Sequence, residues 1–189
     1  MSALDWAWLD TPVGPVSVGC GAAGVVGVRY GPPPGGNLAP AGGLADAARE
    51  QLAEYFSGQR REFDLPLDWS ATAGTQRHVL EVLAGTVRYG ATISYGALAA
   101  RAGLTATGDV LPARVVGQIM GSNPIPVIVP CHRVLASDGL GGYSGGAGPE
   151  TKRWLLILEG ALPPTLDWQP ASPAGNGRGA GAAGQSPSG

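Results

Sequence analysis

The sequence has little charge, little cysteine and histidine, and no long apolar runs. Only 14% of its 189 residues are charged, and it contains two cysteines and two histidines. Two cysteines cannot build a disulfide framework, and so small a set of cysteine and histidine ligands makes a metal site a poor interpretation. No apolar run approaches the length of a membrane span, and the first ten residues lack the basic region of a signal peptide. We therefore expect a cytoplasmic protein without metal or other cofactor, in a compartment where a free thiol survives.

Neither positive nor negative side chains are in large excess. The net charge is −2, which argues against a large footprint of phosphate contacts on nucleic acid. The balance is uneven, because residues 1–73 hold four Arg against eight Asp/Glu, whereas residues 74–162 hold seven Lys/Arg against five Asp/Glu. If a polyanion is bound, we expect the second part to bind it, through groove fit or base contacts rather than through many phosphates.

Glycine and proline, by contrast, are abundant. With 32 and 17 residues they make up about a quarter of the chain, and many lie at 31–43 and 163–189. These two stretches predict a long loop and a disordered tail. The remaining sequence then divides into a domain at residues 1–73 and a second domain at 74–162.

The first domain has the pattern of a small α/β unit. Alternating apolar residues separated by glycine- and proline-rich turns predict a hairpin or meander over residues 5–30. Helical spacing predicts a helix over 44–58 that ends at Gly58, and residues 61–69 are expected to be extended.

The second domain is predicted to be mainly helical. Apolar periodicity and end signals such as Ser94 and Gly103 predict four helices, at 75–90, 94–103, 113–123 and 148–160. The middle two resemble a helix-turn-helix, although residues 104–112 form a longer join than that motif usually has.

The stretch "NPIPVIVPCHRV", residues 123–134, contains the best candidate for chemistry. Its prolines exclude a helix, so Cys131 is expected just after a buried extended segment, where a loop exposes it. A lone cysteine is usually a small buried hydrophobe, and Cys20 fits that description. Cys131 differs, because His132 and Arg133 beside it favour a thiolate.

The pairing of Cys131 with His132 has a geometric difficulty. Neighbouring side chains of an extended chain point to opposite faces, so the two need a turn or an intervening water. The acid that orients His132 must come from elsewhere, and Glu159 is the candidate. The alternative for Glu159 is a solvated carboxylate at a helix end where its charge is slightly unfavourable.

Several motifs together resemble the O6-alkylguanine-DNA alkyltransferases, the methylated-DNA–protein-cysteine methyltransferases. "NPIPVIVPCHRV", "GLGGYSGG" and "KRWLLILEG" are similar to that family's active-site region, and "TISYGALAARAG" with "RVVGQIMGSNP" is similar to its helix-turn-helix. The resemblance is specific over about residues 75–160 and weaker over 5–69. It implies an α+β fold, in which a small ribonuclease-H-like α/β domain precedes a mainly helical, winged helix-turn-helix-like domain.

The resemblance also implies the reaction and its catalytic residues. Cys131 would take the alkyl group from O6-alkylguanine, and from O4-alkylthymine, in double-stranded DNA and keep it as a thioether. His132, through a water, and Glu159 would promote the thiolate, and Tyr95 would donate a proton to the leaving guanine. Because no group in such a site cleaves a thioether easily, the protein would be consumed by one turnover.

The remaining roles concern DNA, approached from the minor groove with the damaged base flipped out of the stack. Arg114 would fill the space that the base leaves. Asn123 would brace the turn between the recognition helix and the active-site loop. The residues expected to surround the base are Met120, Pro126, Val134, Tyr143 and Ser144. Without the motifs, Arg114 would be interpreted as a surface arginine and Tyr95 as a core tyrosine.

The sequence departs from the family pattern in its loops, and other functions remain to be weighed. The join at 104–112 is longer than expected, and the small residues Gly145, Gly146 and Ala147 suggest room for alkyl groups larger than methyl. A non-transferring sensor of alkylated DNA is disfavoured because its relatives replace the cysteine. A helix-turn-helix regulator would have no use for Pro-Cys-His-Arg, and a cysteine hydrolase would need an oxyanion hole and turnover.

Overall fold

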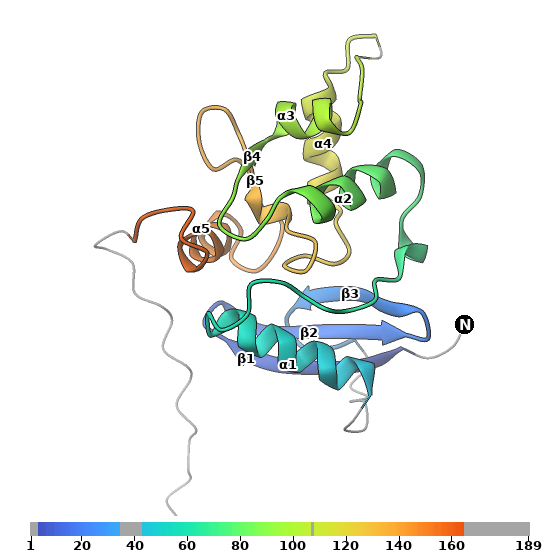
Figure 1. Ribbon diagram of the computed structural model, residues 1–189, viewed down its shortest axis with the longest axis vertical. Coiled ribbons are helices and arrows are strands. Elements are labelled where there is room, and N and C mark those ends of the chain that lie inside the picture. The colour runs from blue at the N-terminus through green and yellow to red at the C-terminus, as the bar shows by residue number, and fades with distance from the viewer. Residues whose placement is uncertain (1–3, 35–42, 107, 165–189) are drawn as a thin grey trace, which may run out of the picture.

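The computed structural model describes residues 4–34, 43–106 and 108–164, so most of the loop at 31–43 and of the tail at 163–189 lies outside it. The described residues mix helices and small sheets, as the predicted α+β class requires. Figure 1 shows a sheet with one helix in the lower part and the remaining helices above it.

The N-terminal part is an antiparallel meander, which confirms the prediction for residues 5–30. Its strands pair in the order β1 (Asp5–Thr11), β2 (Gly14–Gly21) and β3 (Gly24–Tyr30). Gly14 and Gly24 follow the two turns as the first residues of β2 and β3, with φ of 98° and 149°, a region in which side chains with a Cβ are strained. The central strand β2, which pairs with β1 on one side and β3 on the other, is buried over five consecutive residues.

Helix α1 (Leu44–Phe56) covers one face of this sheet (Figure 1). Its buried stripe includes Ala48, Leu52 and Tyr55, which follow the helical period. Gly58 follows the helix with φ of 77° and stops it in the left-handed conformation, as the sequence predicted.

The second part contains short helices and one pair of two-residue parallel strands. The elements are η1 (Trp69–Ala71), α2 (Gly74–Thr86), β4 (Ile93–Ser94), α3 (Tyr95–Arg101), α4 (Pro112–Gly121), η2 (Cys131–Arg133), β5 (Val134–Leu135) and α5 (Pro149–Leu158). Ser94 caps α3 by accepting a hydrogen bond from the Ala97 amide at 3.1 Å, as expected of a serine there. None of the helices in the described ranges is long and apolar enough to cross a membrane.

The helices are somewhat shorter than predicted, and the early end of α2 has a visible reason. Helix α2 ends at Thr86 rather than near residue 90, and Val87 is extended with φ of −108° and ψ of 99°. The guanidinium of Arg133 donates to the carbonyl oxygen of Val87 at 2.7 Å. Arg133 thus occupies a carbonyl oxygen that would accept a backbone hydrogen bond within α2 if the helix continued.

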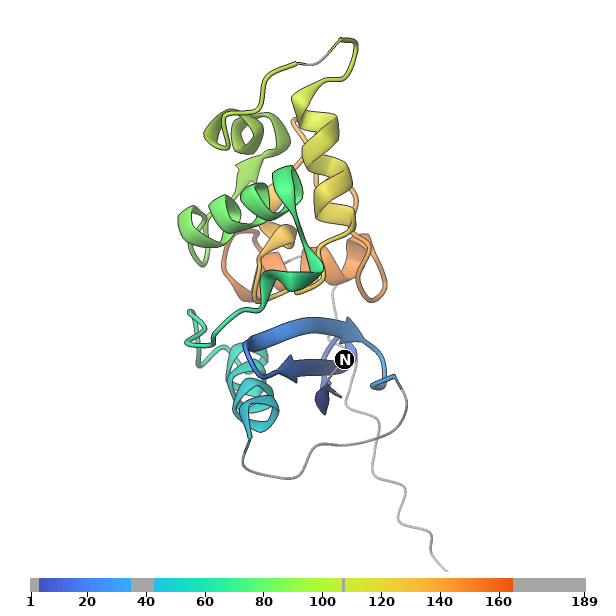
Figure 2. The same cartoon turned by 90° about the vertical axis from the view of Figure 1, so that its right-hand side faces the viewer.

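Strand β3 brings the two parts together. The amide of Val28 donates to the carbonyl of Pro124 at 3.0 Å, so the edge of the sheet is bonded to the loop that leads to Cys131. One cluster of buried apolar side chains continues from the sheet and α1 to α2, α4 and α5. Figure 2 shows β3 as the strand nearest the upper part. The N-terminal sheet therefore supports the candidate site directly.

Candidate active site

Cys131 lies on a turn, not at the end of a strand. Residues 124–130 form turns rather than the predicted extended segment, and Cys131 begins the 3₁₀ turn η2. The amide of Val129 bonds to the carbonyl of Ile125 at 2.9 Å, and Val127 has φ of 74°. The prediction of an exposed loop is also wrong, since Cys131 is only 5% exposed.

Asn123 holds this turn closed. Its Nδ2 donates to the carbonyl of Val129 at 2.9 Å, and its Oδ1 accepts from the amide of Ile125 at 3.0 Å. A single amide side chain thus satisfies two backbone groups that the turn leaves without strand partners. The sequence could not show that these hydrogen bonds from Asn123 would fold the segment into a turn, because its apolar pattern is equally compatible with a buried strand.

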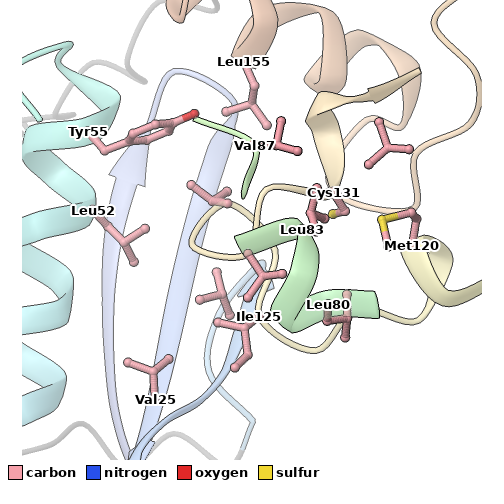
Figure 3. Close-up of a cluster of buried hydrophobic side chains, with 14 of the residues drawn as sticks. Val25, Leu52, Tyr55, Leu80, Leu83, Val87, Met120, Ile125, Cys131 and Leu155 are labelled. Carbon is pink, nitrogen blue, oxygen red and sulfur yellow. The ribbon is translucent and has the colours of Figure 1, made fainter. Parts of the chain in front are cut away.

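The thiol of Cys131 is buried and close to groups that favour its ionised form. Burial raises the pKa of the thiol, while a hydrogen bond from Asn123 and the positive charge of Lys152 lower it in part. In Figure 3 its sulfur lies at the edge of the apolar cluster, close to Met120. The thiol is therefore protonated at rest, and a base is needed to take its proton.

His132 and Glu159 form a buried pair beside the thiol. The Nε2 atom of His132 lies 2.8 Å from Oε1 of Glu159, and the two side chains are fully buried. Burial lowers the pKa of His132, which makes the ring neutral. Burial would raise the pKa of Glu159, but the hydrogen bonds from His132 and Arg133 and the positive charge of Arg133 outweigh it and lower the value to about 2.

These ionisation states determine the tautomer of His132. An ionised carboxylate only accepts hydrogen bonds, so Nε2 of His132 carries the proton and donates it to Glu159. The other nitrogen, Nδ1, is then an unprotonated base. Nδ1 is buried, and no group within the described ranges forms a hydrogen bond with it. A neutral imidazole with a free lone pair thus lies next in sequence to the thiol.

Two further side chains complete the environment of Glu159. Arg133 donates to it from Nε at 2.8 Å and from Nη2 at 2.9 Å, a bidentate ion pair. Tyr55, from helix α1, donates to its Oε1 at 2.7 Å. Glu159 is therefore not the solvated carboxylate of the alternative interpretation.

Two hollows meet at Cys131. The first, which we call the α4 hollow, has a volume of about 330 Å³ and is lined by Tyr95, Gly117, Met120, Gly121, Cys131, Gly142, Tyr143 and Ser144. The second, the β3 hollow, has a volume of about 340 Å³ and lies between strand β3 and the loop after Cys131. Its lining residues are Val28, Arg29, Tyr30, Met120, Asn123, Pro126, Cys131, Tyr143, Ser144, Gly145 and Gly146.

Most of the residues predicted to surround a base therefore lie around Cys131. Met120, Tyr143 and Ser144 line both hollows, and Pro126 lines the second. Val134 does not line either hollow, because it is fully buried in β5. Its carbonyl oxygen accepts a hydrogen bond from Lys152 instead.

Tyr95 and Arg114 lie farther out. Both line an open depression of about 700 Å³ between α3 and α4, next to the α4 hollow. Arg114 is exposed, whereas Tyr95 is partly buried and also reaches the α4 hollow. The arrangement leads from the surface between the two helices to the thiol.

The comparisons with known proteins agree with this geometry. Residues 74–161 match the family model described as 6-O-methylguanine DNA methyltransferase, DNA binding domain. The methylated-DNA–protein-cysteine methyltransferase of Mycobacterium tuberculosis is 37% identical over 167 residues, which cover 85% of this chain and 95% of that protein. The chain belongs to this methyltransferase family.

Other relatives extend the comparison. A Thermus thermophilus protein named DNA base-flipping protein is 40% identical over 157 residues, which cover 82% of this chain and 99% of the relative. The crystal structure of the M. tuberculosis enzyme OGT in complex with DNA has a TM-score of 0.69 at 35% identity, covering 83% of this chain and 93% of that one. The fold of this alkyltransferase is thus similar to that of a solved DNA complex.

The structure also adds residues that sequence reasoning missed. Lys152 is fully buried, and its ammonium donates to the carbonyls of Val134 at 2.7 Å and Gly142 at 3.1 Å. Burial lowers its pKa to about 8. The signal for it was present, because a lysine on the apolar side of the last helix is unusual. Tyr55 and Tyr30 had no such signal, since they lie in the N-terminal part.

Gly145 and Gly146 line the β3 hollow and also lie directly against the ring of Tyr30 and the hydroxyl of Thr151. That they leave room for alkyl groups larger than methyl stays a prediction. A Cβ added at Gly145 would lie 2.3 Å from Cε2 of Tyr30, and one at Gly146 would lie 2.5 Å from Oγ1 of Thr151. These glycines permit close packing of the backbone against those two groups.

Metal ions in proteins are usually bound by sets of His, Cys, Asp and Glu side chains. Within the ranges 4–34, 43–106 and 108–164, no group of three or more His, Cys, Asp or Glu side chains is arranged to hold a metal ion. The reactive groups of the candidate site are a thiol, a neutral imidazole and a carboxylate.

Proposed function

We propose that this protein repairs DNA by transferring the alkyl group of O6-alkylguanine, and of O4-alkylthymine, to the sulfur of Cys131. Membership of the methyltransferase family gives the reaction class. The observation that carries the proposal is a buried thiol whose neighbour in the chain is a neutral histidine, with Nε2 of that histidine 2.8 Å from an ionised carboxylate. No cofactor is required, because the protein itself accepts the alkyl group.

The proton inventory of the transfer can be written for these residues. Nδ1 of His132 takes the thiol proton through one water, and Glu159 stabilises the imidazolium that forms. The thiolate sulfur attacks the alkyl carbon in line with the C–O bond; an S–C bond forms, the C–O bond breaks, and its electron pair goes to O6. The base recovers one proton, which Tyr95 delivers, and is released as guanine.

We also propose how DNA approaches. The thiol lies too deep to reach a base inside a duplex, so the damaged nucleotide must leave the stack, at a cost of a few kcal/mol. Helices α3 and α4 would act as the helix-turn-helix and enter the minor groove, and Arg114 would occupy the vacated space. The exposure of Arg114 beside the open depression supports this arrangement.

The finer assignments of fold belong to the same proposal. The meander with α1 is interpreted as a reduced ribonuclease-H-like domain, and the part from residue 74 to 162 as a winged helix-turn-helix-like domain. The parallel pair β4 and β5 would form the base of the wing. The free thiols of Cys20 and Cys131 fit the cytoplasmic location expected from the sequence.

A sensor that binds alkylated DNA without transfer is not favoured. One relative carries a base-flipping name rather than a methyltransferase name. In this chain, however, the thiol is present together with the histidine and the carboxylate that would activate it.

Mass spectrometry of the intact protein tests the proposal. After mixing with a duplex containing one O6-methylguanine, we expect one added methyl group per protein, on the peptide that contains Cys131, and guanine in the DNA. Cys131→Ala should remove the transfer and retain DNA binding. Transfer that persists in Cys131→Ala, or catalytic turnover with unmodified protein, would contradict the assignment.

A further inference from the structure

Strand β3 forms one wall of the candidate site. The strand lies outside residues 74–161, the part matched by the family model. Tyr30, the last residue of β3, lines the β3 hollow together with Cys131. Its hydroxyl lies 2.9 Å from the hydroxyl of Tyr143, a residue 113 positions later in the chain. Tyr143 in turn lines both hollows. An N-terminal side chain therefore forms part of the wall of the cavity beside the reactive sulfur.

The ring of Tyr30 is held firmly in this position. Its ring and that of Tyr143 meet edge to face, with centroids 6.3 Å apart and an angle of 80° between the planes. Its Cε2 lies 2.3 Å from the position that a Cβ on Gly145 would take, so the ring packs directly on the backbone there. Strand pairing adds a third constraint, because Tyr30 is in register with Val16 of β2.

In-line attack requires space beside the sulfur. The attacking sulfur, the transferred carbon and the leaving oxygen are nearly collinear, so the rest of the alkyl group projects sideways from this line. The α4 hollow, next to Tyr95 and the open depression, is the side from which the base enters. The carbons of a longer alkyl group beyond the transferred one would then enter the β3 hollow, which the ring of Tyr30 lines.

We propose that Tyr30 determines the size of the alkyl group that Cys131 accepts, by closing the β3 hollow with its ring. This inference rests on the proposed alkyl transfer and goes beyond it by naming a selectivity residue in the N-terminal part. The phenol ring of tyrosine is about as large as a benzyl group. Its removal would leave a space of matching shape, in the way that an emptied apolar cavity accepts benzene.

The hydroxyl pair has a different role from the ring. Burial raises the pKa of both Tyr30 and Tyr143, so both hydroxyls stay protonated and one donates to the other. The pair fixes the angle of the ring but adds little to its size. Tyr30→Phe therefore retains the wall, whereas Tyr30→Ala removes it.

The experiment compares transfer rates from two duplexes that differ only in the alkyl group, O6-methylguanine and O6-benzylguanine. We expect Tyr30→Ala to increase the ratio of benzyl to methyl rates about tenfold or more, the scale on which a pocket discriminates small apolar groups. Tyr30→Phe should leave the ratio within about threefold of the unchanged protein. Trp8→Ala, which removes a 40% exposed aromatic side chain from β1, is the matched control and should not alter the ratio.

The outcomes separate this inference from the proposed function. If the unchanged protein transfers no methyl group, the proposed function fails. If it transfers methyl and Tyr30→Ala leaves the ratio unaltered, the inference fails alone. An equal effect of Tyr30→Phe would overturn the size argument, since only the hydroxyl is lost. Tyr30→Leu provides a second variant of smaller volume, and the ratio is insensitive to a fraction of unfolded protein because both rates fall together.

Discussion

The ion pair of Glu159 permits a quantitative test of the site's electrostatics. Glu159→Gln removes the negative charge that Arg133 and His132 face, and leaves a guanidinium buried beside an amide. The pKa of Glu159 is lowered from 4.5 to about 2 in the folded protein. At 1.36 kcal/mol for each pH unit, this corresponds to about 3 kcal/mol of unfolding free energy. Leaving one partner of a buried ion pair uncompensated costs a similar amount, about 3–5 kcal/mol.

The pH dependence gives the sign of the effect. The folded pKa lies below the unfolded one, so the stabilisation is fully present above pH 4.5 and is lost as the pH falls towards about 2. Glutamine does not titrate. The difference in unfolding free energy between the unchanged protein and Glu159→Gln should therefore shrink by about 2 kcal/mol between about pH 7 and about pH 3.

Urea unfolding followed by tryptophan fluorescence measures this difference at each pH. The matched control is Glu81→Gln, because Glu81 forms an exposed i,i+4 pair with Arg77 at 2.8 Å. That pair should contribute at most about 0.5 kcal/mol and show little dependence on pH. A difference for Glu159→Gln that is equal at both pH values would refute the reasoning, since it would mean that the ionised carboxylate is not what the fold stabilises.

Three further predictions test the thiol, the contact from α1 and the cap of α3. Burial raises the pKa of Cys131 above its ordinary 9.0, so the rate at which iodoacetamide labels Cys131 should keep increasing above pH 9.0. Asn123→Ala removes a hydrogen bond that lowers this pKa and should move the pH dependence of labelling to still higher pH. A labelling midpoint below pH 9.0 would contradict this. Tyr55→Phe removes a 2.7 Å hydrogen bond to the charged Glu159, and should lower the unfolding free energy by about 1.5–3 kcal/mol; an unchanged urea midpoint would show that the bond contributes nothing. Ser94→Ala should cost about 1 kcal/mol through loss of the helix cap and leave the intrinsic reactivity of Cys131 towards iodoacetamide unaltered; a changed reactivity would mean that the cap also shapes the site.

Much of the fold could be predicted because its signals are local. Turn glycines and alternating apolar residues identified the meander, and helical spacing with end residues such as Gly58 and Gly103 identified the helices to within a few residues. The errors occurred where a distant group competes with the local pattern. Arg133 binds the carbonyl of Val87 and ends α2 early, and Asn123 folds an apolar stretch into a turn.

The candidate site shows the same division. Its nucleophile and neighbouring base could be found from one short motif, since Cys131 and His132 are adjacent in the chain. Glu159 could be suggested as the acid that orients His132, and the family resemblance implies the same role. Its burial and its bidentate bond to Arg133 are visible only in the structure. The packing of Tyr30 against the small residues after Tyr143 could not be predicted, because nothing in the local sequence indicates that contact.

The sequence by itself determined the identity of the reactive groups and the approximate positions of strands β1 to β3 and of helices α1 to α5. Tertiary structure decided which of these groups meet. Tyr55 reaches Glu159 across 104 positions, and Tyr30 reaches Tyr143 across 113. The physical reason is that propensity and periodicity act over a few residues, whereas these contacts depend on how the edge of a sheet packs on a distant turn. The ionisation states of the site follow from that packing, because burial and neighbouring charges shift the pKa values of the thiol, the histidine and the carboxylate.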